Sequence, residues 1–113
     1  MGFILKGKNM VIYEVNLTIN TEIYPQFQLW LKKHAAEIIQ FPGFIQAYIL
    51  RQDKEEISNQ KKLTVQYLLD NRDVLDKYFV ELAPMMREEG LNLFQNQFSA
   101  ERRVLEVDEV IFK

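Results

Sequence analysis

The residues of this chain best suited to chemistry are one indole, one imidazole and two phenols. Trp30 and His34 lie four positions apart, so a helix places both on the same face. Tyr13 and Tyr67 fall in segments that alternate like strands, and their parity directs both toward that helix. The imidazole is the group whose ordinary pKa lies near neutrality. The pattern predicts a ligand-binding cleft formed by Tyr13, Trp30, His34 and Tyr67.

The same four residues also suit an ordinary hydrophobic core. A single histidine on an apolar stripe is usually a core residue with one nitrogen bonded, and tryptophan at helical spacing usually packs. If the cleft is open, His34 is a candidate general base or axial ligand. The sequence leaves both interpretations standing and assigns no residue a catalytic role.

Composition removes several kinds of site. The 113 residues include no cysteine, which excludes disulfides, thiolate nucleophiles and cysteine-bound metals. With one histidine and no carboxylates at ligand spacing, we predict no metal site and no cofactor. The net charge is −2, so the chain lacks the positive charge typical of nucleic-acid-binding proteins. Residues 62–67 also lack the motif of RNA-recognition modules, and we expect no nucleic-acid partner. No apolar run approaches the roughly 18 residues that cross a bilayer, so we expect a cytoplasmic protein without a membrane partner.

Six segments with regular apolar spacing must position these groups. The predicted strands span about 10–19, 44–51, 62–69 and 97–107. The predicted helices run from Ile23 or Tyr24 to the Phe41-Pro42-Gly43 turn, and from Asn71 to Phe94 with a break at Pro84. The residues 20–22 and 70–73 offer helix caps, and Ser58-Asn59 marks the tip of a charged hairpin loop.

This element order predicts an α+β fold, a ferredoxin-like β-α-β-β-α-β sandwich with a four-stranded antiparallel sheet. Residues 10–107 then form one domain. Residues 1–9 are expected to be a disordered N-terminal extension. Residues 108–113 are expected to be a C-terminal tail at a dimer interface, because Val110-Ile111-Phe112 is apolar.

The fold leaves one face of the sheet without helices. That face is predicted to carry large apolar groups, and burying each one is worth roughly 1.5–3 kcal/mol. We therefore predict a two-fold homodimer with sheets packed face to face, the alternative being a monomer with a half-polar open sheet. Glu14 and Arg102 are expected to face each other there, as an interface ion pair or an anion anchor. The interface or anchor candidates are Glu14, Asn16, Tyr48, Gln66 and Arg102.

Short motifs along the chain resemble a family of uncharacterised bacterial proteins known as a domain of unknown function. These motifs are Val11–Asn16, Trp30 with His34, Gly43-Phe44, Val65–Tyr67, Ala83-Pro84 and Phe98 with Arg102, and the resemblance covers about 10–107. The family is placed among dimeric α+β barrels, beside antibiotic-biosynthesis monooxygenases and haem-degrading proteins. The resemblance implies that fold and a dimer, but no established activity. Haem-degrading relatives use Asn, Trp and His, yet here Trp30 and His34 share one helix, which argues against haem breakdown.

Three functions fit these patterns, and a fourth is disfavoured. The leading hypothesis is an uncharacterised homodimer that binds a small apolar or aromatic molecule between helices and sheet. The alternatives are a non-catalytic structural or interaction dimer and a cofactor-independent monooxygenase-like enzyme. An amino-acid-sensing module is disfavoured because residues 20–22 lack glycine for close ligand approach. An open space beside Trp30 and His34 would favour ligand binding over a filled core.

Overall fold

The computed structural model describes residues 3–6, 9–52 and 59–113 of the chain, with side chains from residue 9 onward. The strands are β1 (Phe3–Lys6), β2 (Val11–Asn20), β3 (Phe44–Arg51), β4 (Gln60–Leu69), β5 (Phe98–Glu106) and β6 (Glu109–Phe112). The helices are α1 (Tyr24–Ile38), α2 (Arg72–Glu81) and α3 (Ala83–Phe94), with short 3₁₀ turns at Thr21–Ile23 and Gln95–Gln97.

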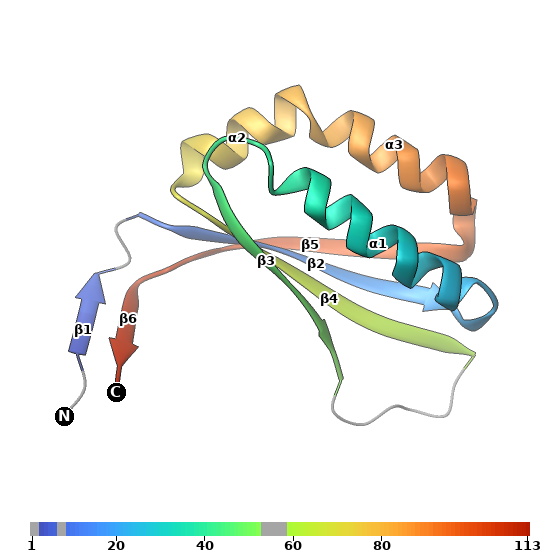
Figure 1. The fold of residues 1–113 in the computed structure, drawn as a ribbon, viewed down its shortest axis with the longest axis horizontal. Helices are drawn as coiled ribbons and strands as arrows, with labels where there is room; N and C mark the ends of the chain where they lie inside the picture. The colour runs from blue at the N-terminus through green and yellow to red at the C-terminus, as the bar shows by residue number, and fades with distance from the viewer. Residues whose placement is uncertain (1–2, 7–8, 53–58) are drawn as a thin grey trace.

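Four strands form one antiparallel sheet in the order β3-β4-β2-β5, and the three helices cover one of its faces (Figure 1). This is the predicted α+β ferredoxin-like sandwich, with the second helix divided in two. We call the side of the sheet without helices the open face. The core lies between helices and sheet, and Phe27, Ile19, Leu69, Leu75 and Val65 are its largest fully buried side chains.

The alternation in β2 and β4 decides which side chains reach the core. Val11, Tyr13, Leu17 and Ile19 on β2 are all buried. On β4, Leu63, Val65, Tyr67 and Leu69 are buried in the same way. The register pairs Tyr13 with Tyr67 and Val15 with Val65. The odd-numbered residues of both strands therefore lie on the same face of the sheet, toward the core. The sequence predicted these parities correctly.

The two predicted helix caps have different outcomes. The Asn71 side chain accepts a hydrogen bond from the Val74 backbone amide at 3.0 Å, which confirms the second cap. Asn20 makes no such bond, and residues 21–23 form a 3₁₀ turn before α1 begins at Tyr24. Pro25, in the first turn of α1, has no amide hydrogen, so fewer donors need a cap there. Pro84 stands in the first turn of α3, where the break was predicted.

The turn between α1 and β3 depends on Gly43. Its φ is +96°, a conformation that residues with a side chain rarely adopt. Its carbonyl accepts a hydrogen bond from the Asp70 amide at 2.9 Å, which ties the turn to the end of β4. A methyl group at this position would lie 2.4 Å from Cγ2 of Val74. The turn therefore packs directly against the first turn of α2.

The two ends of the chain pair with each other. β1 and β6 form a separate two-stranded antiparallel ribbon, with Phe3 opposite Phe112 (Figure 1). β1 lies within the predicted N-terminal extension, and β6 lies within the predicted C-terminal tail. Because β1 and β6 lie at opposite ends of the sequence, no local sequence pattern predicts that they pair. Residues 1–2 and 7–8 of that extension, and Ser58 of the predicted loop tip, lie outside the described residues.

Candidate functional site

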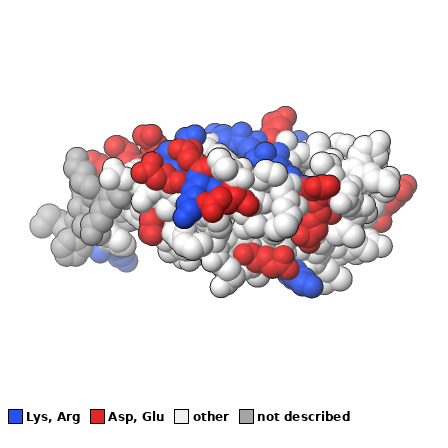
Figure 2. All heavy atoms as spheres, turned by 90° about the horizontal axis from the view of Figure 1, so that it is seen from above, with Lys and Arg blue, Asp and Glu red and all other residues white. Residues whose placement is uncertain are grey.

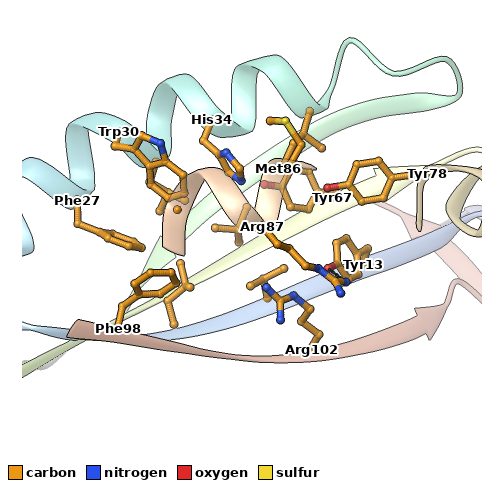
Figure 3. Close-up of a pocket in the computed structure, with 16 residues that line it drawn as sticks. Tyr13, Phe27, Trp30, His34, Tyr67, Tyr78, Met86, Arg87, Phe98 and Arg102 are labelled. Atoms are coloured by element: carbon orange, nitrogen blue, oxygen red, sulfur yellow. Dashed lines mark hydrogen bonds between the residues drawn. The ribbon is translucent and has the colours of Figure 1, made fainter. Parts of the chain in front are cut away.

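A cavity of about 60 Å³ lies between α1, α3 and the sheet (Figure 3). We call it the aromatic cavity. It is bordered by His34, Met86, Gly90, Arg87 and Arg102 and by six aromatic residues: Tyr13, Phe27, Trp30, Tyr67, Tyr78 and Phe98. A space of this size holds a few water molecules and is smaller than the roughly 150 Å³ that accommodates benzene in an engineered apolar cavity. The predicted four cleft residues are thus brought together around a real but small space.

Trp30 and His34 form one wall of the aromatic cavity. Their rings stack with centroids 4.2 Å apart, as the four-residue spacing predicted. The indole nitrogen of Trp30 donates a hydrogen bond to Oε1 of Glu89 on α3 at 3.3 Å. A methyl group at Gly90 would lie 2.9 Å from Cη2 of Trp30. Glycine at this position therefore lets α3 approach the indole closely.

His34 brings an unusual polar atom into this wall. Its Nδ1 is buried and has no hydrogen-bond partner among the described residues. Such an unsatisfied buried atom costs about 1–3 kcal/mol and is rare in folded proteins. Burial lowers the pKa of His34 below its ordinary value, and the nearby Glu89 carboxylate opposes that shift. The imidazole is therefore neutral at pH 7 and can accept a hydrogen bond or a proton.

Three tyrosines form the opposite wall. The rings of Tyr13 and Tyr67 stack at 5.8 Å, and Tyr78 lies 6.2 Å from Tyr13. Burial, aided by the neighbouring tyrosines, raises the pKa of both Tyr67 and Tyr78 above the ordinary value. Their hydroxyls stay protonated at neutral pH and can donate hydrogen bonds. The Tyr13 hydroxyl accepts a hydrogen bond from Nη2 of Arg87 at 3.2 Å.

Arg102 does not lie where the sequence placed it. The register sets Arg102 opposite Val15, and it sets Arg103 opposite Glu14. Arg102 therefore points to the helix side and borders the aromatic cavity, as Figure 3 shows. The parity of β5 contained this information, because Phe98 and Val104 have the same parity and pack against the core. Neither Arg87 nor Tyr78, which also border the aromatic cavity, had a specific signal in the sequence.

Glu14 is buried on the open face, with 4% of its surface exposed. Arg103 donates to its Oε2, Asn16 donates to the same oxygen at 3.0 Å, and Gln66 donates to Oε1 at 2.9 Å. Thr64 completes this carboxylate cluster by donating to Asn16 at 2.7 Å. These hydrogen bonds, led by that of Arg103, lower the pKa of Glu14 from 4.5 to about 2. The prediction that Glu14 faces Arg102 is wrong, because the register sets Arg103 opposite Glu14 and the ion pair forms with that residue.

Asn16 and Tyr48 both lie on the open face of the sheet, opposite Thr64 and Gln66 of β4. Asn16 is bonded within the carboxylate cluster on the open face, so the sheet separates it from Trp30 and His34. The three residue types of haem-degrading relatives therefore do not converge here. Tyr48 is 52% exposed on edge strand β3, and its hydroxyl accepts a hydrogen bond from Gln46 at 2.6 Å.

Hollows lie on the open face among the residues that the structure describes. One, of about 600 Å³, runs over the carboxylate cluster and is bordered by Leu50, Lys62 and Glu101. Another, of about 230 Å³, is mostly apolar and is bordered by Ile12, Tyr48, Leu68 and Val110. In the described part of the chain, no three His, Asp or Glu residues are grouped to hold a metal ion. Nor is any helix among those residues long and apolar enough to cross a membrane.

The sandwich is similar in fold to solved structures that include putative antibiotic biosynthesis monooxygenases. A cofactor-independent oxygenase from Streptomyces nogalater, SnoaB, matches 84% of this chain and 90% of its own, with a TM-score of 0.63 and 14% identity. A Bacteroides thetaiotaomicron protein of unknown function matches 88% of this chain and 98% of its own, with a TM-score of 0.68 and 12% identity. At these identities the similarity shows the fold alone.

Residues 10–108 match the family described as domain of unknown function DUF4286. The chain belongs to this family, as its motifs suggested. No curated protein matches it significantly.

Proposed function

We propose that this chain is a homodimeric protein that binds a small apolar or aromatic molecule in the aromatic cavity. One observation carries the proposal: the buried Nδ1 of His34 has no partner in the described part of the chain. A bound molecule with a hydroxyl or amide hydrogen would satisfy that atom while its apolar part packed against the aromatic rings. A merely structural core would gain by bonding or replacing the imidazole. A cytoplasmic location remains part of this proposal.

Binding requires the aromatic cavity to expand, since its volume is only about 60 Å³. Two bordering side chains can adjust. Met86 is unbranched and flexible, and Arg87 is exposed to solvent on α3. The wall formed by Phe27 and Trp30 is more firmly held, because Phe27 is fully buried and also packs on Phe98 at 5.0 Å. The ligand therefore enters from the side of α3.

Small aromatic compounds are expected to raise the melting temperature of the protein. Binding at a hundredfold excess over Kd stabilises a protein by about 2.7 kcal/mol, a shift on the order of 10 °C for a domain of this size. A thermal-shift panel of phenol, indole, benzoate and haem measures it. His34→Ala should reduce the response to the hydrogen-bonding compounds. Leu29→Ala, at a site on α1 that is 72% exposed, should leave it unchanged.

A panel without any stabilising compound would leave the structural dimer as the better interpretation. An unchanged response of His34→Ala would show that the imidazole does not contact the bound compound.

The neutral imidazole also favours a second candidate, cofactor-independent oxygenation, because it can accept a proton from a bound phenol. Oxygen uptake in the presence of a stabilising phenol separates this activity from binding alone.

The dimer is proposed to form through the open face. Tyr48 and Leu50 of β3 are 52% and 42% exposed, and Val110 of β6 borders the apolar hollow beside Leu68. The helix side also exposes apolar groups, with uncharged surface between the charged side chains in Figure 2. Leu91 and Leu93 of α3 are 55% and 58% exposed there. A test of the dimer must therefore compare the two surfaces.

Leu68→Lys is expected to convert the protein from a dimer to a monomer. A charge at this position would be desolvated between two sheets. Sedimentation velocity at micromolar concentration measures the change, and Leu93→Lys on α3 is the matched control that should remain dimeric. Dissociation of Leu93→Lys alone would move the interface to the helix side. A wild-type monomer would end the dimer proposal.

A further inference from the structure

Two arginines border the aromatic cavity at one end. Arg87 comes from α3 and Arg102 from β5, so elements distant in sequence bring them together. Figure 3 shows both guanidinium groups beside Tyr13. Arg87 donates to the Tyr13 hydroxyl at 3.2 Å and lies over the ring of Phe79 at 5.7 Å. Both arginines are exposed, so this end of the cavity meets solvent.

Neither arginine forms an ion pair with a carboxylate of the described residues. The neighbouring Arg103 uses Glu14 on the other face, and Arg72 uses Asp76 one turn further along α2. Glu89 of α3, which lies near the cavity, accepts from the indole of Trp30 instead. Two guanidinium groups on one site without a counter-charge repel each other, and an anion between them would remove that repulsion.

The arginine end of the aromatic cavity is positively charged, whereas the rest of its wall is mostly aromatic. Guanidinium groups match carboxylates in planar, two-bond geometry. The interior beyond them is formed by aromatic rings, among them Trp30, Tyr67 and Phe98. A ligand that satisfies both regions has an anionic group at one end and an apolar or aromatic body at the other.

We propose that the ligand of the aromatic cavity is a small aromatic or apolar acid, whose carboxylate is held by Arg87 and Arg102. This inference rests on the proposed function, because it assigns a substrate class to the same site. The body of the acid lies among Trp30, Tyr67 and Phe98, and its carboxylate stays at the solvent-facing end. Tyr13, already bonded to Arg87, orients that guanidinium toward the ligand.

Calorimetric titration of matched acids and amides tests the proposal. The pairs are benzoate with benzamide, phenylacetate with phenylacetamide, and salicylate with salicylamide. The wild-type protein is expected to bind at least one acid about tenfold or more tightly than its amide, and added salt should weaken only the acid. The Arg87→Gln, Arg102→Gln double variant should lose this preference while its affinity for the amide changes less than about threefold. Arg72→Gln, an exposed arginine of α2, is the matched control.

The outcomes separate the two proposals. Equal binding of acid and amide by the wild-type protein, or an acid preference that survives in the double variant, overturns the arginine anchor and leaves the aromatic cavity as a binding site. Absence of binding by every acid and amide overturns both. Circular dichroism melting of the double variant checks that it folds, and the single variants provide the same comparison if it does not.

Discussion

Replacing Gly43 with alanine is expected to destabilise the protein by about 2–5 kcal/mol. Two costs add at this position. The backbone φ of +96° is strained for any residue with a side chain, at roughly 1–2 kcal/mol. The new methyl group would also lie 2.4 Å from Cγ2 of Val74, and forced repacking of this kind costs about 1–3 kcal/mol.

Urea unfolding at pH 7 measures the effect of Gly43→Ala. In a Val74→Ala background the same substitution should cost less, because the clash is relieved and the backbone strain alone remains. A loss below about 1 kcal/mol for Gly43→Ala in the otherwise wild-type chain would contradict the turn geometry. An equal loss in both backgrounds would show that α2 does not press on this turn.

Glu14→Gln is expected to cost about 1.5–3 kcal/mol at pH 7, since charge-assisted hydrogen bonds are worth that much and three side chains donate to this carboxylate. The loss is also pH-dependent. The pKa of Glu14 is lowered from 4.5 to about 2, so the folded state holds the proton less tightly than the unfolded state does. Its stabilisation is therefore complete above about pH 4.5 and disappears as the pH falls toward 2.

Urea unfolding of wild type and Glu14→Gln at a series of pH values checks both statements. The difference between the two curves should shrink steadily between pH 4.5 and 2. Glu101 is exposed on the open face, the same face as Glu14. The free energy of unfolding of Glu101→Gln should therefore stay within about 0.5 kcal/mol of the wild-type value at every pH. A difference that does not change with pH would mean that the carboxylate is not the stabilising group.

The elements of this fold follow from local patterns. Period-two alternation in β2 and β4 places Tyr13 and Tyr67 on the core side, and the four-residue spacing stacks Trp30 on His34. Pro84 ends α2 because proline cannot continue a helix. These features depend on residues close together in the chain, so the sequence alone predicts them.

The rest depends on partners far away in the chain. Arg102 shares the parity of Phe98 and Val104 and therefore belongs to the helix side. The residue of β5 that faces Glu14, in contrast, is set by the register of β5 against β2, which no single segment reveals. Glu14 looks like a surface residue until β4 and β5 bring it Gln66 and Arg103. The pairing of β1 with β6 joins the two ends of the chain. The residue types of the chain predicted the aromatic cavity, but they did not predict that Arg87 and Arg102 border it.

Trp30 is the single tryptophan of the chain, and its indole rests on His34 in the wall of the aromatic cavity. Emission excited selectively from indole therefore reports on this one place. A protonated imidazole in ring contact quenches indole fluorescence, while the neutral form does so weakly, so intensity follows the charge of His34. The protein thus contains an intrinsic optical probe of the protonation of His34 in the wall of the aromatic cavity.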